Sequence, residues 1–346
     1  MPAPHPPQPT IGLDVGGANT KAAVVDGDGR ARIVSEPFEV WREPGAMAAV
    51  IADVVGRFGF DDAPVAMTTT AELVDVFASK REGVLHVLDA AAEAMPGRVL
   101  RVMTTHGELV GLEAARAAPL SCAAANWVAT ALLLGRWLPD AILLDCGGTT
   151  TDVIPIVAGR VAAQGQTDVE RLLAGELVYT GALRTNIAAV VSEVPIGGRP
   201  CPVSSELFAV TADAHLLRGR LEPEQCTCTF PDNRGTTPGE VRSRLARVVC
   251  ADPDQLADGD LEAIALTVEE AQVQAIAGAL ARVASHLATE VPVVAVGVGA
   301  FLARAAAQRC GLAIHPPERS PLGGRGGDVA AAVALSVLGT LSVLRQ

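Results

Sequence analysis

The sequence predicts an α/β protein of two domains that face one central phosphate-binding cleft. The first observation is a repeat: the segment IGLDVGGANTKAAVVD at 11–26 returns in altered form as LLDCGGTTTDVIPI at 143–156. The second is the length, because 346 residues suit two domains that each bury a core of their own. The third is the alternation of strand-like and helix-like apolar patterns along the chain.

Each copy of the repeat has the pattern of a strand, a tight turn and a returning strand. An apolar run delivers an aspartate, Asp14 or Asp145, and a glycine pair follows. Glycines let the backbone turn tightly, and the exposed N–H groups of such a turn suit phosphate oxygens. The predicted phosphate-binding residues are Gly16, Gly17, Asn19 and Thr20 in the first copy and Gly147, Gly148, Thr149, Thr150 and Thr151 in the second. The alternative is an ordinary hairpin with a glycine turn.

The charge balance excludes several classes of partner. The formal net charge is -12 with a pI near 5.0, which argues against general binding to nucleic acid or to an anionic membrane. We therefore expect small-molecule substrates, with neither a nucleic-acid nor a membrane partner. An anionic substrate would need local cations, and the chain's only two lysines are Lys21 and Lys80. The alternative explanation is compositional drift that left two lysines by chance.

The cysteines and the chain ends predict a cytoplasmic protein. Seven cysteines at irregular spacing indicate reduced thiols. Cys226 and Cys228 form a C-x-C pair, which lacks the usual spacing of zinc ligands, so we do not expect a zinc site. Residues 1–9 are expected to form a disordered proline-rich tail. The apolar segment 328–344 is shorter than the roughly 20 residues of a membrane span, so a buried helix is expected there.

The first domain is assigned to residues 10–138 plus 328–346. After the first repeat, the apolar spacing predicts strands at 31–40, 64–70 and 98–105 and helices at 45–59, within 71–95 and within 109–138. Strand ends that feed loops are where ligands bind in open α/β sheets. The candidate cleft residues that follow the second of these strands are Glu72, Asp75, Lys80 and Arg81. The alternative is that these four residues form a solvated helix face. Asn126 could either cap a helix or contact a ligand, and both interpretations stay open.

The second domain is assigned to residues 139–327, with a flap near 222–238. The patterns predict a hairpin at 141–166, helices from Thr167, at 204–219, 238–250 and 261–288, a strand at 291–299 and a flexible turn at 323–328. The glycines Gly297 and Gly299 after that last strand predict a third turn that faces phosphate or nucleoside. The alternative is a plain buried strand with a tight turn into a helix.

Tyr179 is the only tyrosine and lies between Gly175 and Gly181. Arg171 and Arg184 lie near it in the sequence, which suggests that all three side chains bind substrate. The alternative is a core aromatic on a strand, which is the more frequent position of a single tyrosine.

With these motifs in place, the sequence resembles the superfamily of actin, sugar kinases and chaperone ATPases. IGLDVGGANTK looks like its first phosphate motif, LLDCGGTTTD like its second and VVAVGVGA like its adenosine motif. The resemblance implies two ribonuclease-H-like domains, the actin-like ATPase fold, closing on a phosphate chain.

A closer resemblance is to the hydantoinase A and oxoprolinase-like branch linked to tetrahydromethanopterin-dependent one-carbon metabolism, which includes a methanofuran-biosynthesis synthase. The more specific segments are ELVDVF, ANW and GELVYTG, within a match that spreads from residue 11 to about 300. The sequence departs from the branch at CTCTFPDNRGTTP, where an acidic Asp-Gly-Arg type of loop is expected.

This branch implies a transferase that joins a phenol to an aminomethylfuran diphosphate and releases diphosphate. Mg²⁺ on Asp14, Asp145 or Asp152, helped by Lys21, would neutralise the leaving group. Glu72, Asp75 or Asp152 would take the phenol proton. ATP is compatible with the motifs but is not required, and a homodimer is compatible as well. The rivals are an ATP-dependent kinase or amide-ring hydrolase, and a nucleotide-sensing scaffold without turnover.

Overall fold

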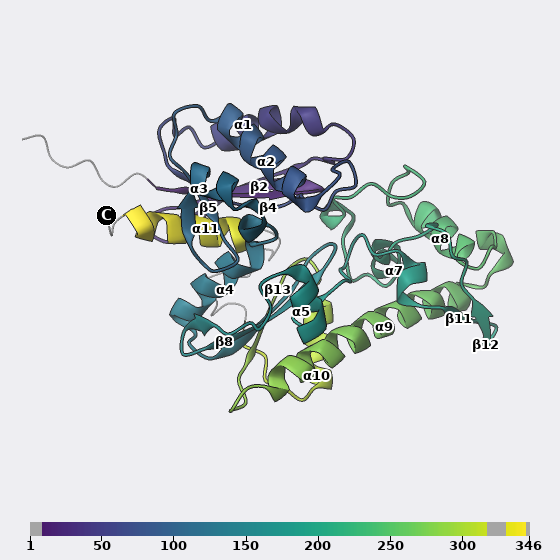
Figure 1. Cartoon of the computed structure of the whole chain (residues 1–346). Helices are drawn as coiled ribbons and strands as arrows, with labels where there is room; N and C mark the ends of the chain where they lie inside the picture. The colour runs from purple at the N-terminus through teal and green to yellow at the C-terminus, as the bar shows by residue number, and fades with distance from the viewer. Residues whose placement is uncertain (1–8, 317–329, 344–346) are drawn as a thin grey trace, which may run out of the picture. The chain divides into compact units, whose positions relative to one another are not determined.

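The computed structural model describes residues 9–316 and 330–343 (Figure 1). These residues form two compact units. Unit 1 contains 9–140, 156–170 and 330–343, and unit 2 contains 141–155 and 171–316. Residues 156–170, which the sequence interpretation places in the second domain, thus group with unit 1. The expected tail over residues 1–8 and the expected turn at 323–328 lie outside the described residues.

Unit 1 is built on a six-stranded mixed sheet in the order β3-β2-β1-β4-β5-β6. Its strands are β1 (Ile11–Gly16), β2 (Asn19–Val25), β3 (Ala31–Pro37), β4 (Val65–Thr70), β5 (Leu100–Met103) and β6 (Leu109–Gly111). β1 pairs antiparallel with β2 and parallel with β4, so it is a central strand. Its buried residues Ile11, Leu13 and Val15 belong to the main core of the unit.

Helices cover both faces of this sheet. They are α1 (Met47–Gly56), α2 (Lys80–Ala94), α3 (Leu112–Ala117), α4 (Asn126–Trp137) and α11 (Ala330–Val343). Figure 1 shows α1 and α2 on one face and α11 on the other, with α4 beside α11. Residues 330–343 therefore pack on unit 1.

Unit 2 is built on a second sheet in the order β10-β8-β7-β13, with β9 paired to the end of β8. Its strands are β7 (Ala141–Cys146), β8 (Thr151–Val157), β9 (Arg160–Val161), β10 (Leu177–Val178) and β13 (Val293–Val296); β8 and β9 reach into residues grouped with unit 1. A separate hairpin joins β11 (Glu193–Ile196) to β12 (Arg199–Pro202). β7 and β13 are parallel, and their apolar runs fill one core with α9 and α10.

The helices that follow in the chain are α5 (Asp168–Ala174), α6 (Ile187–Val190), α7 (Thr211–Leu217), α8 (Pro238–Arg247), α9 (Asp258–Ser285) and α10 (Ala300–Arg309). The helix predicted at 204–219 is wrong in its first half, because the helix begins only at Thr211. Asp213 explains the late start: its Oδ2 atom accepts from the Val210 N–H at 3.0 Å and caps the helix there.

No helix in 9–316 or 330–343 combines the length and the apolar character needed to cross a bilayer.

A substitution at Gly12 on β1 tests how closely α11 packs against the sheet. A Cβ added there would lie 1.9 Å from the Ala332 carbonyl oxygen. Because that neighbour is backbone, Gly12→Ala should lower the free energy of unfolding by about 2 kcal/mol or more, measured by urea titration. Gly56→Ala on α1 is the matched control, since nothing lies within 4 Å of its added Cβ. Equal effects of the two variants would contradict the packing of α11 on β1.

Candidate functional site

The first glycine turn joins β1 to β2 in unit 1 and sets three polar side chains on one face of the sheet. Asp14 pairs with Lys21 across the antiparallel strands and with Thr68 across the parallel ones. Residues directly opposite in register point to the same face. Asp14 is 7% exposed, and the buried Oγ1 atom of Thr68 makes no hydrogen bond within the described part of the chain. The turn therefore presents a carboxylate, an ammonium and a hydroxyl together.

The second glycine turn joins β7 to β8 in unit 2. The Gly147 N–H donates to the Thr150 carbonyl at 2.9 Å, which closes a tight turn after Asp145. Thr151 is fully buried, and its hydroxyl donates to the Thr180 carbonyl at 2.8 Å. Burial also raises the pKa of the Cys146 thiol to about 12, so this residue stays a neutral thiol. Both copies of the repeat are thus strand, turn and strand, as predicted.

The backbone of residues 181–183, which follow β10, contacts the second turn. The N–H groups of Ala182 and Leu183 donate to the carbonyls of Gly147 and Gly148, each at 2.9 Å. Gly181 lies so close that an added Cβ would sit 2.5 Å from the Thr149 nitrogen. The sequence interpretation treats Gly181 only as a break in the chain, because nothing in the local sequence links it to the turn.

The third glycine turn, after β13, packs against the same strand end. Gly297 has a φ of +93°, and a Cβ there would lie 2.1 Å from the Cys146 carbonyl oxygen and 2.8 Å from Asp145 Oδ1. The Gly299 N–H donates to the Cys146 carbonyl at 2.8 Å, and α10 begins at the next residue. Unit 2 therefore brings the second and third predicted turns together at Asp145.

Asp152 and Arg171 form a buried ion pair in unit 2. The Arg171 Nη2 atom lies 2.7 Å from Asp152 Oδ1 and also donates to the Glu176 carbonyl at 3.0 Å. Arg171 is 2% exposed. The sequence predicts Asp152 as a metal ligand and Arg171 as a substrate-binding residue. In the structure these two side chains bind each other.

Glu72 is a carboxylic acid held almost entirely out of water two residues after β4. It is 2% exposed, and its Oε2 atom has no hydrogen-bond partner among residues 9–316 and 330–343. Burial raises its pKa to about 7. The Glu72 and Ala124 N–H groups and the charge of Lys80 lower the pKa, whereas Asp168 raises it. Ala124 has a φ of +49°, an unfavourable conformation for a residue other than glycine. Glu72 therefore changes its protonation state near neutral pH.

Lys80 begins α2 and binds Asp168 rather than standing alone. Its Nζ atom lies 2.6 Å from Asp168 Oδ2, and both side chains are largely shielded from solvent. Asp168 was not among the predicted residues, because 88 positions separate the two in sequence. Asp75 and Arg81, by contrast, are exposed on the loop and on the first turn of the helix.

The remaining predicted substrate residues lie at the surface or at a helix end. Tyr179 is 59% exposed directly after β10, so it is not the core aromatic of the alternative interpretation. Arg184 is exposed, and the half-buried Asn126 begins α4.

The irregular segment near 222–238 is anchored by one buried arginine from α8. Arg244 donates to Asp213 Oδ1 at 2.8 Å, to Asp232 Oδ1 at 3.1 Å and to the Gly235 carbonyl at 3.0 Å. Its guanidinium also lies 4.1 Å from the centre of the Phe230 ring. This part of unit 2 is therefore held by charge-assisted hydrogen bonds and a cation–π contact.

The described residues contain no group of three or more His, Cys, Asp or Glu side chains that could hold a metal ion. Cys226 and Cys228 accordingly show no zinc cluster within that part of the chain. Mg²⁺ is often bound by only one or two carboxylates, with phosphates and water completing its shell. Asp14 and Asp145, each at a strand end beside a glycine turn, fit that mode.

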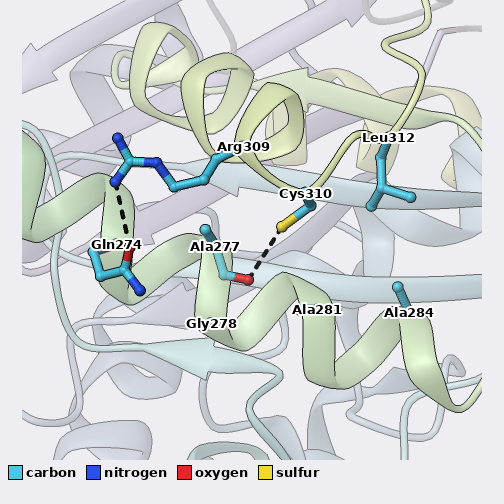
Figure 2. A pocket seen from close by; sticks show the side chains of 8 residues that line it. All are labelled: Gln274, Ala277, Gly278, Ala281, Ala284, Arg309, Cys310 and Leu312. Atoms are coloured by element: carbon cyan, nitrogen blue, oxygen red, sulfur yellow. Dashed lines mark hydrogen bonds between the residues drawn. The ribbon is translucent and has the colours of Figure 1, made fainter.

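A groove of about 440 Å³ lies on unit 2 between α9 and α10, away from the predicted residues (Figure 2). Its lining residues are Gln274, Ala277, Gly278, Ala281, Ala284, Arg309, Cys310 and Leu312. Arg309 donates to Gln274 Oε1 at 3.4 Å, and Cys310 Sγ donates to the Ala277 carbonyl at 3.3 Å. The groove therefore presents mainly small apolar side chains.

Comparison with known structures shows the actin-like ATPase fold. A nucleotide-free structure of acetone carboxylase aligns with a TM-score of 0.61 at 12% identity, covering 95% of this chain and 69% of that one. A PilM-PilN type IV pilus biogenesis complex aligns with a TM-score of 0.51 at 14% identity, covering 97% and 99%. At such low identity these likenesses concern the fold alone.

Comparison with known sequences is more specific. A protein of Methanocaldococcus jannaschii named (4-{4-[2-(gamma-L-glutamylamino)ethyl]phenoxymethyl}furan-2-yl)methanamine synthase is 35% identical over 252 residues, which are 72% of this chain and 74% of the relative. The family model for hydantoinase/oxoprolinase matches residues 64–334, more than half of the chain. The chain therefore belongs to the hydantoinase/oxoprolinase family.

Proposed function

We propose that this protein is a transferase of methanofuran or methylofuran biosynthesis that joins an aminomethylfuran diphosphate to a phenol. The acceptor would be a γ-glutamyltyramine-like or tyrosine-derived phenol. The observation that carries the proposal is the synthase relative at 35% identity, whose name describes a phenoxymethyl-furan methanamine. That product contains one aryl ether bond between a phenol oxygen and a furfuryl carbon.

The proposed reaction is a displacement at the furfuryl carbon. The phenol oxygen forms a bond to this carbon, the bond from carbon to the diphosphate oxygen breaks, and diphosphate leaves with the electron pair. The phenol proton passes to a base on the protein. A furfuryl carbon stabilises positive charge well, so charge on the leaving diphosphate is what the protein must balance.

The glycine turns and Lys21 suit the leaving group. We assign the binding of phosphate oxygens to the N–H groups of the turns and to the ammonium of Lys21, which faces Asp14 on the sheet. Asp14 in unit 1 or Asp145 in unit 2 would hold Mg²⁺, and Asp152 is the weaker candidate because it already binds Arg171 at 2.7 Å. Mg²⁺, when bound, would neutralise the charge that develops on the departing diphosphate.

Glu72 is the best base of the three carboxylates considered. Asp75 is exposed, and Asp152 is bound to a buried arginine, which favours its charged form and weakens it as a base. Glu72 has a pKa of about 7, so it is partly ionised at neutral pH and strong enough to accept a phenol proton as the ether forms. Lys80 and Asp168, which lie in unit 1 with Glu72, shift the pKa of Glu72 in opposite directions.

The overall reaction is tested by incubating the full chain with Mg²⁺, the aminomethylfuran diphosphate and γ-glutamyltyramine, without ATP. We expect mass spectrometry to detect the ether, with one diphosphate released per ether. Asp14→Ala should remove at least about 99% of the product, because the charge at the first turn is lost. Absence of ether from the wild-type chain, together with ATP hydrolysis in a parallel sample, would instead support the ATP-dependent kinase or hydrolase alternative.

Glu72→Gln should lower kcat by roughly 100-fold or more, since the amide cannot accept the phenol proton. The same variant should be more stable than wild type at pH 8. The folded-state pKa is raised from 4.5 to about 7, so wild type loses stability as pH rises between these values. The difference in unfolding free energy should grow from near zero at pH 4 to roughly 3 kcal/mol at pH 8. Loss of activity in Asp75→Asn but not in Glu72→Gln would reassign the base.

Two neighbours of Glu72 should move the pH dependence in opposite directions. Wild-type kcat/KM should fall below a pH of about 7 as Glu72 becomes protonated. Asp168→Asn removes a negative charge that raises the pKa of Glu72, so the midpoint should move to lower pH. Lys80→Met removes a positive charge, so the midpoint should rise. Midpoints that move together, or not at all, would show that another group controls the profile.

A further inference from the structure

A chain of buried polar groups runs through unit 2 from a charged cluster to the second glycine turn. Glu269 accepts from Arg218 Nε at 2.7 Å and lies 3.0 Å from Arg220 Nη2. The Nδ1 atom of His215 lies 4.0 Å from the Glu269 carboxylate and has no hydrogen-bond partner within the described residues. Its Nε2 atom lies 2.8 Å from Gln272 Oε1. His215 and Gln272 are both fully buried. The hydrogen-bonded chain toward the turn thus begins at the His215 imidazole, which lies beside the charged cluster.

The hydrogen bonds fix the orientation of Gln272. Its Nε2 atom donates to Thr180 Oγ1 at 2.8 Å and to the Gly181 carbonyl at 2.9 Å. The amide oxygen therefore faces His215. Because this oxygen can only accept a hydrogen bond, His215 Nε2 must carry the proton and donate it. Burial lowers the pKa of His215 to about 4, so the ring is neutral and its other nitrogen is unprotonated. An amide turned the other way would set oxygen against oxygen at Gly181.

Gly181 is the point at which this chain of contacts meets the turn. Its carbonyl accepts from Gln272 Nε2 and from Thr211 Oγ1, each at 2.9 Å, and from Thr185 Oγ1 at 3.4 Å. Its Cα packs against the Gly148–Thr149 peptide, as its short Cβ distance shows. The next residues then donate to the turn's carbonyls. A shift of Gly181 would therefore rotate the peptide planes whose N–H groups the second turn presents.

We propose that Gln272, oriented by His215, is a positioning residue for phosphate binding at the second glycine turn. This inference rests on the proposed function only in requiring that the turn bind phosphate oxygens. Gln272 touches no ligand in this scheme and acts through the Gly181 carbonyl. Each hydrogen bond of Gln272 is buried, so replacing its donor by an acceptor would leave two acceptors facing each other at Gly181.

The test compares Gln272→Glu with Gln274→Glu, two changes of the same kind on one helix. Glutamate keeps the shape of Gln272 and, in its ionised form, replaces the donor to Gly181 with an acceptor, so binding is measured at pH 8. Gln274 is exposed two residues further on, where its side chain accepts from Arg309. Affinity for inorganic diphosphate with Mg²⁺ is measured by calorimetry on the full chain, with thermal unfolding recorded in parallel. We expect about tenfold weaker binding or more for Gln272→Glu and unchanged binding for Gln274→Glu.

A second pair of variants covers the case in which Gln272→Glu does not fold. His215→Gln retains an N–H donor that can reach Gln272, whereas His215→Leu removes the donor and leaves the Gln272 amide oxygen buried without a hydrogen bond. We expect His215→Gln to keep most of the diphosphate affinity and His215→Leu to lose about tenfold. Equal affinities for these two variants would overturn the inference.

Two further results are decisive. A folded Gln272→Glu chain with wild-type diphosphate affinity and only a lower melting temperature would show a merely structural role and overturn the inference. A wild-type chain that binds no diphosphate would overturn it as well, whatever the ether assay gives. If wild type binds diphosphate but makes no ether, the proposed function fails, and the comparison of Gln272→Glu with Gln274→Glu still decides the role of Gln272.

Discussion

Close contact of backbone with backbone around Asp145 is the constraint on which unit 2 depends. β7 ends at the next residue, Cys146, against which Gly297 packs, and Gly181 packs against the Gly148–Thr149 peptide, both at distances that exclude a Cβ. Carbonyl groups in such close contact need protein partners. The Gly299 N–H donates to the Cys146 carbonyl, the Ala182 N–H to Gly147 and the Leu183 N–H to Gly148. These hydrogen bonds hold the second turn from the carbonyl side.

Buried charged side chains have different kinds of partner in the two units. In unit 2 the buried charged groups are paired, as in Asp152 with Arg171 and Asp213 with Arg244. In unit 1 the carboxyl of Glu72 is buried with a lysine that binds another acid, Asp168. A close arginine lowers the pKa of a buried carboxylate, yet burial still raises the pKa of Asp213 to about 6. The hydrogen bonds differ more clearly: both carboxylate oxygens of Asp213 accept hydrogen bonds, whereas Glu72 Oε2 has no partner within the described residues.

Family membership and fold carry different amounts of functional information here. The actin-like ATPase fold is shared with an acetone carboxylase chain and a pilus biogenesis complex at 12% and 14% identity, so it says little about chemistry. The synthase relative at 35% identity is the basis for proposing the formation of an aryl ether. In that proposal Glu72 would take the phenol proton and the N–H groups of the glycine turns would bind the phosphate oxygens. Tyr179 and Arg184 stay predicted substrate-binding residues.

The sequence by itself determined the two strand-turn-strand repeats, the α/β class and the third glycine turn, because these depend on local periodicity and on glycine. It also supplied Glu72 as a candidate, since a polar residue follows a buried strand. Tertiary structure alone decided which acid is buried, that Lys80 binds Asp168, that Arg171 binds Asp152 and that Gln272 reaches Gly181. Each of the last three links joins residues 19 to 91 positions apart. Charge pairing and burial depend on which residues the fold places next to each other. No local pattern in the sequence determines the distance between residues so far apart along the chain.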